Sequence, residues 1–71
     1  MTKLEALIYI TEKVKTDEEV FILRAHDVLA VPVVFYWAQL AEKHGVDLKK
    51  VAGAWKVAER MIGFTSRRIP D

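Results

Sequence analysis

Basic and aromatic side chains are the residues of this 71-residue sequence with the clearest chemical use. Guanidinium and ammonium groups pair with phosphates, and flat rings stack on nucleobases. These side chains predict a binding site for a small anionic, nucleotide-like ligand. The predicted ligand contacts are Arg24, His26, Tyr36, Lys56, Arg60, Arg67 and Arg68.

The basic residues of the last expected helix also have a plain structural interpretation. Lys49, Lys56 and Arg60 share its outer side, and such a stripe is equally typical of a solvated helix face. Gly53 interrupts the stripe, so a ligand or another backbone would approach closely there. The sequence leaves both interpretations open.

The cluster Arg24-Ala25-His26-Asp27 is similarly open. In the structural interpretation Asp27 caps the following helix, Arg24 pairs with Asp27, and His26 is exposed. Arg67 and Arg68 belong to an expected irregular tail, where cations are often solvated. Convergence of these groups on one site is therefore a hypothesis that only the fold can test.

Catalysis and metal binding are not predicted. The sequence has no cysteine, no glycine-rich phosphate loop and no paired-histidine zinc motif. Two histidines are few ligands for a catalytic metal. We predict a non-enzymatic protein that has no cofactor and no metal site.

The segment Val31–His44 organises the predicted fold, because it reads as one helix with a very wide apolar arc. The expected core-facing residues are Val33, Val34, Trp37, Ala38, Leu40 and Ala41. Phe35 falls outside this arc and Tyr36 on its border. These two rings either tuck under the N-terminal segment or are covered by another copy of the chain. The predicted oligomer interface comprises Phe21, Phe35, Tyr36 and Trp37.

The remaining segments predict a mainly α domain over residues 1–71. Thr2 and Glu5 form a capping box for an N-terminal helix, although the branched residues 8–11 keep a strand alternative open. Residues 20–24 are an extended segment or a short strand that needs a partner.

Gly45 and Asp47 then separate two helices of an antiparallel hairpin built around Trp37 and Trp55, the second running from Leu48 to about Ile62. Expected inner-face residues of that second helix are Leu48, Val51, Ala54, Trp55, Ala58, Met61 and Ile62. Gly63 ends it, and residues 64–71 form a basic tail.

Composition limits the partners. The net charge of +1 is too balanced for a protein dedicated to gripping duplex phosphates. The hydrophobic content of 52% in a short chain without disulfides favours a homo-oligomer. The apolar runs are too short for a membrane span, and the N-terminus lacks signal-peptide features. We therefore expect no membrane partner and a cytoplasmic location.

A DNA-binding helix-turn-helix is the alternative function. Residues 40–51 resemble that motif, with Gly45 in the turn and Lys49, Lys50 and Lys56 on the helix that would enter the major groove. His44 stands where the motif prefers an apolar residue, and Leu48 where it prefers a polar one. The expected reading face also lacks the usual base-reading side chains.

A family resemblance rests on the run VFILRAHD at residues 20–27, on Trp37-Ala38 and Met61, and on the final RRIPD. These anchors, spread over residues 19–71, resemble small helical proteins encoded by phages and prophages. In architecture alone, an oligomeric helical hairpin is similar to phage sponge proteins that sequester cyclic nucleotide signals. The resemblance implies sequestration of a nucleotide-like ligand or inhibition of a host defence protein, in the cytoplasm of the host cell.

Overall fold

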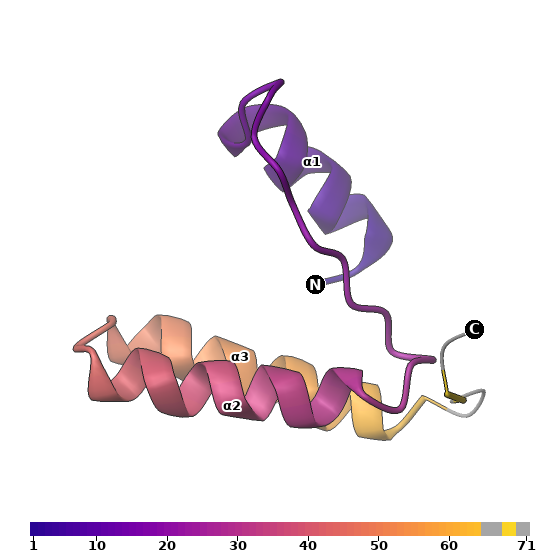
Figure 1. The fold of residues 1–71 in the computed structure, drawn as a ribbon, viewed down its shortest axis with the longest axis vertical. Helices are drawn as coiled ribbons and strands as arrows, with labels where there is room; N and C mark the ends of the chain where they lie inside the picture. The colour runs from indigo at the N-terminus through magenta and orange to yellow at the C-terminus, as the bar shows by residue number, and fades with distance from the viewer. Residues whose placement is uncertain (65–67, 70–71) are drawn as a thin grey trace.

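The protein folds into three helices with irregular connections. The computed structural model describes residues 1–64, 68 and 69. The helices are α1 (Lys3–Lys13), α2 (Ala30–Lys43) and α3 (Leu48–Ile62), and no strand forms in this described part (Figure 1). The mainly α fold class is thereby confirmed.

Helix α1 begins at the predicted capping box. The Glu5 carboxylate accepts a hydrogen bond from the Thr2 backbone N–H at 2.8 Å, and Thr2 Oγ1 accepts one from the Glu5 N–H at 3.3 Å. Residues 8–11 are helical, so the strand alternative for them is wrong. No residue of α1 is buried, and α1 makes no helix–helix contact with α2 or α3. Isolated helices of this length are marginal in water, so α1 lacks the packing that usually stabilises a helix.

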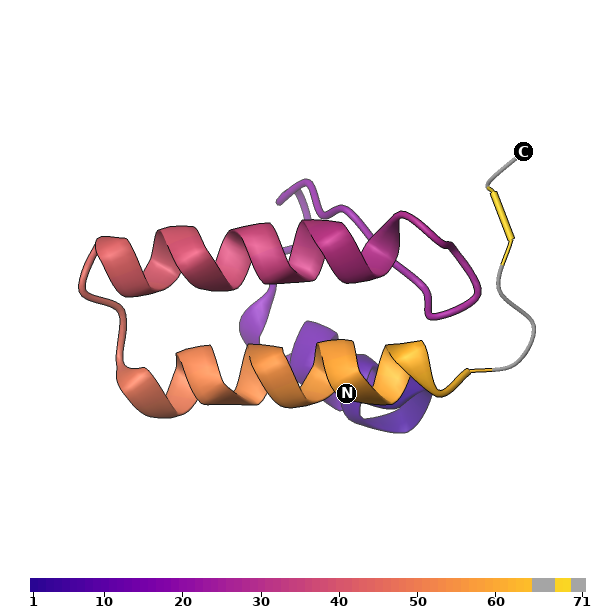
Figure 2. The same ribbon diagram turned by 90° about the horizontal axis from the view of Figure 1, so that it is seen from below.

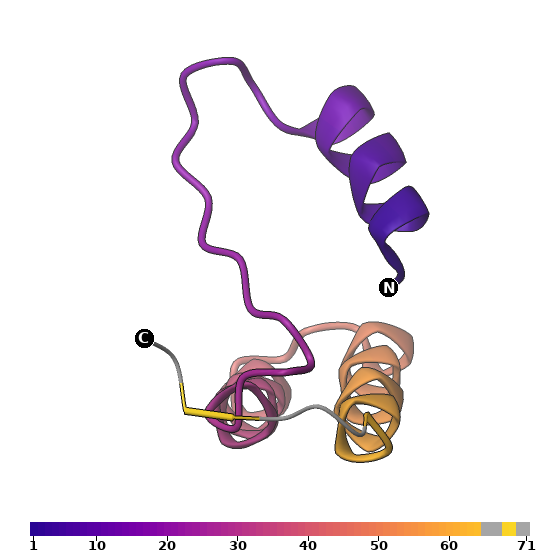
Figure 3. The same cartoon turned by 90° about the vertical axis from the view of Figure 1, so that its right-hand side faces the viewer.

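An irregular segment leads from α1 to α2, and Figure 3 shows it looping away from the helices before it returns. Residues 20–24 belong to it and form no strand within the described part of the chain. At its end, Asp27 Oδ1 accepts a hydrogen bond from the Leu29 N–H at 2.7 Å. Asp27 thus holds the turn before α2, close to its predicted capping role, although Leu29 is the residue that directly precedes the helix.

Helices α2 and α3 form the predicted antiparallel hairpin, lying side by side along their length (Figure 2). Gly45 in the connection has a φ of +77°, a backbone conformation that residues with a Cβ rarely adopt. Asp47 caps α3, since its Oδ1 accepts a hydrogen bond from the Lys49 N–H at 2.7 Å. Both predicted boundary residues are confirmed, as is the end of α3 at Gly63.

Small side chains make the contact between the two helices. Ala38 and Ala41 of α2 pack with Val51 of α3, and Val46, Ala54 and Trp55 lie against this cluster. Ala30, Val31 and Ala58 are also buried. The described core thus contains alanines and valines, and no large side chain is fully buried in it.

The predicted core face of α2 is partly wrong. Ala38 and Ala41 are buried and Val34 is half-buried, but Val33, Trp37 and Leu40 are exposed. Phe35, expected outside the core arc, instead packs on Trp55 with ring centroids 4.8 Å apart and planes tilted by 39°. The hairpin therefore forms around Phe35 and Trp55, because α2 turns its small residues toward α3 and this rotation moves Trp37 outward.

The predicted inner face of α3 is correct in its middle and wrong at its ends. Val51 and Ala58 are buried, and Ala54, Trp55 and Met61 are half-buried. Leu48 and Ile62 are exposed, since they are the first and last residues of the helix. Periodicity places a residue on a face but does not say how far along the helix the neighbouring element reaches.

Substitution of the buried alanine of α3 should destabilise the protein. Ala58 has no exposed surface, so Ala58→Leu inserts three carbons into a filled space and should lower the free energy of unfolding by about 1–3 kcal/mol. Ala52 is exposed on the same helix, so Ala52→Leu is the matched control and should change it by less than about 0.5 kcal/mol. Urea unfolding followed by circular dichroism measures both. Equal stability of the two variants would contradict the described hairpin packing.

Acid should weaken α1 through its capping box. Hydrogen bonds from the Thr2 N–H and hydroxyl, aided by the charges of the N-terminus and Arg60, lower the pKa of Glu5 below its ordinary value of 4.5. A lowered pKa in the folded state means stabilisation that is present above about pH 4.5 and is lost as the pH falls through the folded-state pKa. Helical circular dichroism should therefore decrease below that pH, less so in Glu5→Gln, whereas Glu12→Gln should behave like wild type. The same acid response in all three proteins would rule out the cap as its origin.

Candidate functional site

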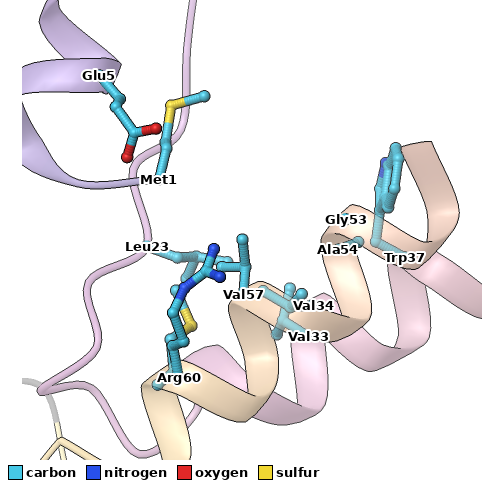
Figure 4. A pocket seen from close by; sticks show the side chains of 11 residues that line it. Met1, Glu5, Leu23, Val33, Val34, Trp37, Gly53, Ala54, Val57 and Arg60 are labelled. Carbon is cyan, nitrogen blue, oxygen red and sulfur yellow. The ribbon is translucent and has the colours of Figure 1, made fainter. Parts of the chain in front are cut away.

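An open apolar groove runs along the hairpin on the side that faces the start of α1; we call it the hairpin groove (Figure 4). Its volume is about 590 Å³. Helix α2 contributes Val33, Val34 and Trp37, and the α1 region and the following segment contribute Met1, Glu5 and Leu23. The lining residues of α3 are Gly53, Ala54, Val57, Arg60 and Met61.

Two charged side chains stand in this mainly apolar lining. Arg60 comes from the last turn of α3, and Glu5 from the first turn of α1. The charge of Arg60 contributes to the lowered pKa of Glu5, which indicates that the two groups sense each other electrostatically. Glu5 also accepts the hydrogen bond from Thr2, so Arg60 is the cation of the groove and Glu5 is occupied by its own helix.

A flat ring and an open backbone position complete the groove. Trp37 is 44% exposed and offers its indole from α2. On α3, a Cβ built at Gly53 would meet no atom within 4 Å. A ligand can therefore approach the backbone of α3 at Gly53, opposite an aromatic surface.

Only one of the residues predicted to contact the ligand lines the hairpin groove. Arg60 lines it, whereas Lys56 on the same helix and Tyr36 on α2 are exposed outside the lining. Gly53, singled out in the sequence as a point of close approach, does border the groove. The basic stripe of α3 is thus divided, with Arg60 at the groove and Lys56 on the solvated side.

A second group of predicted ligand contacts lies where residues 26–28, just before α2, pair with Arg68 near the C-terminus. The Arg68 N–H donates to the His26 carbonyl, and the Val28 N–H donates to the Arg68 carbonyl at 2.9 Å. Together they form an isolated parallel bridge between Asp27 and Arg68. The His26 Nδ1 is shielded from solvent without a hydrogen-bond partner among the described residues. Arg24 is exposed beside this bridge, and Arg67 lies outside the described residues.

The four predicted interface residues differ in their solvent exposure. Phe21 is 86% exposed and Tyr36 is 63% exposed, and Trp37 is exposed to a lesser degree. Phe35 is half-buried, and its ring packs on Trp55 of its own chain. Phe35 packs on α3 rather than under the N-terminal segment, and Tyr36 remains 63% exposed, so cover of these rings by a second copy stays a prediction.

Sequence reasoning missed most of the groove lining. Val57 and Met61 follow Gly53 at intervals of four residues, and this spacing places the three on one side of α3. The sequence pattern divides this side, because it places Gly53 in the outer basic stripe and Met61 on the inner apolar face, so it does not predict a continuous groove wall. Met1, Glu5 and Leu23 reach the groove through the path of the chain, for which the sequence carries no local signal.

Comparisons with known proteins give no further guide. No protein family model, curated protein or solved structure matches this chain. In the described part of the chain, no helix is long and apolar enough to cross a bilayer, and no three histidine or acidic side chains gather as a metal site would require. The function must therefore be argued from the groove and the exposed surfaces.

Glycine substitutions should separate the open helix position from the strained turn. Gly53→Ala meets no neighbouring atom and removes unfolded-state freedom, so it should raise the free energy of unfolding by about 0.5–1 kcal/mol. Gly45→Ala forces a Cβ into a backbone with φ +77° and should lower it by about 1–2 kcal/mol. Urea unfolding tests both variants. A destabilised Gly53→Ala protein would mean that another backbone rests on this glycine.

Proposed function

We propose that the protein is a non-enzymatic, homo-oligomeric binding protein that captures a small anionic, nucleotide-like ligand in the hairpin groove. One observation carries the proposal: Arg60 and Trp37, a cation and a flat ring from neighbouring helices, line the same groove. Guanidinium groups pair with phosphate oxygens, and indole rings stack on nucleobases. Binding of this kind needs no catalytic residue.

The size and lining of the groove define the ligand class. Small-molecule sites in proteins are mainly apolar, occupy about 300–1,000 Å³ and carry a few polar groups, and the groove volume of about 590 Å³ lies in this range. Glu5 opposes additional negative charge beside Arg60. The ligand therefore carries a flat body and one accessible anionic group, as a nucleoside monophosphate or a cyclic nucleotide does.

The biological role follows from capture without turnover. A phage-type protein that removes a nucleotide signal from the host cytoplasm needs affinity and abundance and no chemistry of its own. Inhibition of a host defence protein is the variant of this role in which exposed apolar surface meets a protein. The Arg60 and Trp37 pair favours the small ligand.

The hairpin geometry argues against the helix-turn-helix alternative. In that motif two helices cross at about 90–120°, which frees the second helix for the major groove. Here α2 and α3 run antiparallel and side by side (Figure 1). We therefore do not propose DNA binding.

Removing the charge of Arg60 should weaken ligand binding, whereas removing the charge of Lys56 should not. A panel of nucleoside monophosphates and cyclic mono- and dinucleotides should raise the melting temperature of the wild type for at least one member. Arg60→Gln removes the charge-assisted contact and should weaken binding of that member by about 10–100-fold. Lys56→Gln, one turn away and outside the lining, should bind like wild type. Isothermal titration calorimetry measures the affinities.

Two outcomes would contradict the proposed function. The first is a panel in which no nucleotide shifts the melting temperature. The second is equal binding by Arg60→Gln and wild type, which would place the ligand elsewhere. Trp37→Ala extends the test to stacking, since loss of a ring–base stack should weaken binding by about 1–3 kcal/mol.

A further inference from the structure

Helix α2 carries a second apolar face that its own chain leaves partly exposed. It consists of Leu29, which precedes the helix, and of Val33, Tyr36, Trp37 and Leu40, and we call it the α2 stripe. Its members are between 38% and 63% exposed. Leu29, Val33, Tyr36 and Leu40 follow one another at intervals of four, three and four residues. This is the spacing of the seam along which two helices pack in a coiled coil.

The chain exposes more solvent-accessible surface than a compact monomer of the same mass. A compact monomer of 8.1 kDa exposes about 4,500 Å², whereas this chain exposes 6185 Å². The excess is about 1,700 Å² per chain. This excess is spread over the whole chain, including α1 and the segment before α2, so the α2 stripe supplies only part of the surface that a second copy would cover.

We propose that the α2 stripe is a homodimer interface, occupied by the α2 stripe of a second copy in antiparallel orientation about a two-fold axis. The inference rests on the homo-oligomer in the proposed function and names its contact surface. The sequence from Leu29 to Leu40 contains no charged residue, so the stripe fits a partner surface that is itself apolar. A second copy supplies such a surface at equal length and with the same spacing, as two-fold symmetry requires.

Charge decides the orientation. Helix α2 has a basic residue, Lys43, in its last turn and no acidic residue in its first turn. Glu42 balances the charge of Lys43 in that turn, but parallel helices would still bring the like ends of the helix dipoles together. Antiparallel helices place opposite dipole ends side by side. Leu29 of one chain then lies near Leu40 of the other.

The interface and the hairpin groove share a border. Val33 and Trp37 belong to both the α2 stripe and the groove lining. The partner's α2 would therefore stand beside the groove as an additional wall.

Light scattering on the full chain tests the surface. The wild type should have twice the 8.1 kDa mass of one chain at micromolar concentration. Leu40→Glu buries a charge at the seam and should halve the mass. The matched control is Leu48→Glu, a leucine 71% exposed on α3 and outside the stripe, which should remain dimeric. A monomeric wild type, or a dimeric Leu40→Glu protein, would overturn the proposal.

A second variant separates this interface from exchange of α1. Leu7→Glu alters the exposed face of α1 and leaves the stripe intact, so it should remain dimeric. A dimer that is lost in Leu7→Glu and kept in Leu40→Glu would assign the contact to α1 instead. Circular dichroism of each variant reports whether the hairpin is still helical.

Disulfide trapping tests the orientation without disturbing the fold, because the chain has no native cysteine. Leu29→Cys and Leu40→Cys are oxidised separately and as an equal mixture. Antiparallel pairing predicts that the mixture cross-links into dimers and that neither variant alone does, since eleven helical residues separate like positions by about 16 Å. Cross-linking of each variant alone would show parallel pairing and overturn the antiparallel orientation.

The outcomes distinguish the dimer from the proposed ligand. Mass and cross-linking are measured without any nucleotide, so they test the interface alone. A dimer whose melting temperature no nucleotide shifts supports the interface and rejects the ligand. A monomer that binds a nucleotide through Arg60 supports the groove and rejects the interface.

Discussion

The close approach of α2 and α3 through small side chains is the constraint on which the rest of this structure depends. Ala38 and Ala41 meet Val51 in the described core, and Ala58 is fully buried farther along α3. Alanine lets two helix backbones come near each other, whereas a large side chain would hold them apart. The hairpin therefore keeps its small residues inside and has to place most of its bulky ones elsewhere.

Two surfaces result from that packing. The Phe35 and Trp55 rings close one side of the hairpin by stacking obliquely on each other. On the other side Trp37 and Val33 remain open, and they border the hairpin groove and the α2 stripe. Since α1 has no buried residue and makes no helix–helix contact with the hairpin, the chain exposes more surface than a compact protein of its size. That surplus is the physical basis for proposing self-association.

The polar chemistry of the chain favours binding over catalysis in our proposal. Arg60 and Trp37 line the same groove, whereas Arg24 and His26 lie where residues 26–28 pair with Arg68. The basic residues that were predicted to share one ligand site therefore lie at two separate sites in the folded chain. A guanidinium and an aromatic ring that line one groove suit recognition of an anionic group on a flat ligand, and this pairing is the basis of our proposal.

The sequence by itself determined the start of α1, the turn between α2 and α3 and both ends of α3, because capping and turn interactions join residues within a few positions of one another. Thr2 with Glu5, Gly45 and Asp47 act through their own backbone and near neighbours, so their roles are visible without a fold. Only the tertiary structure decided which face of α2 is buried. Nearly the whole circumference of α2 from Val31 to Leu40 is apolar, so periodicity allows several rotations, and the fit of its alanines to α3 selects one. The groove was decided in the same way, because Glu5, Trp37 and Arg60 come from three helices that only the folded chain places around one space.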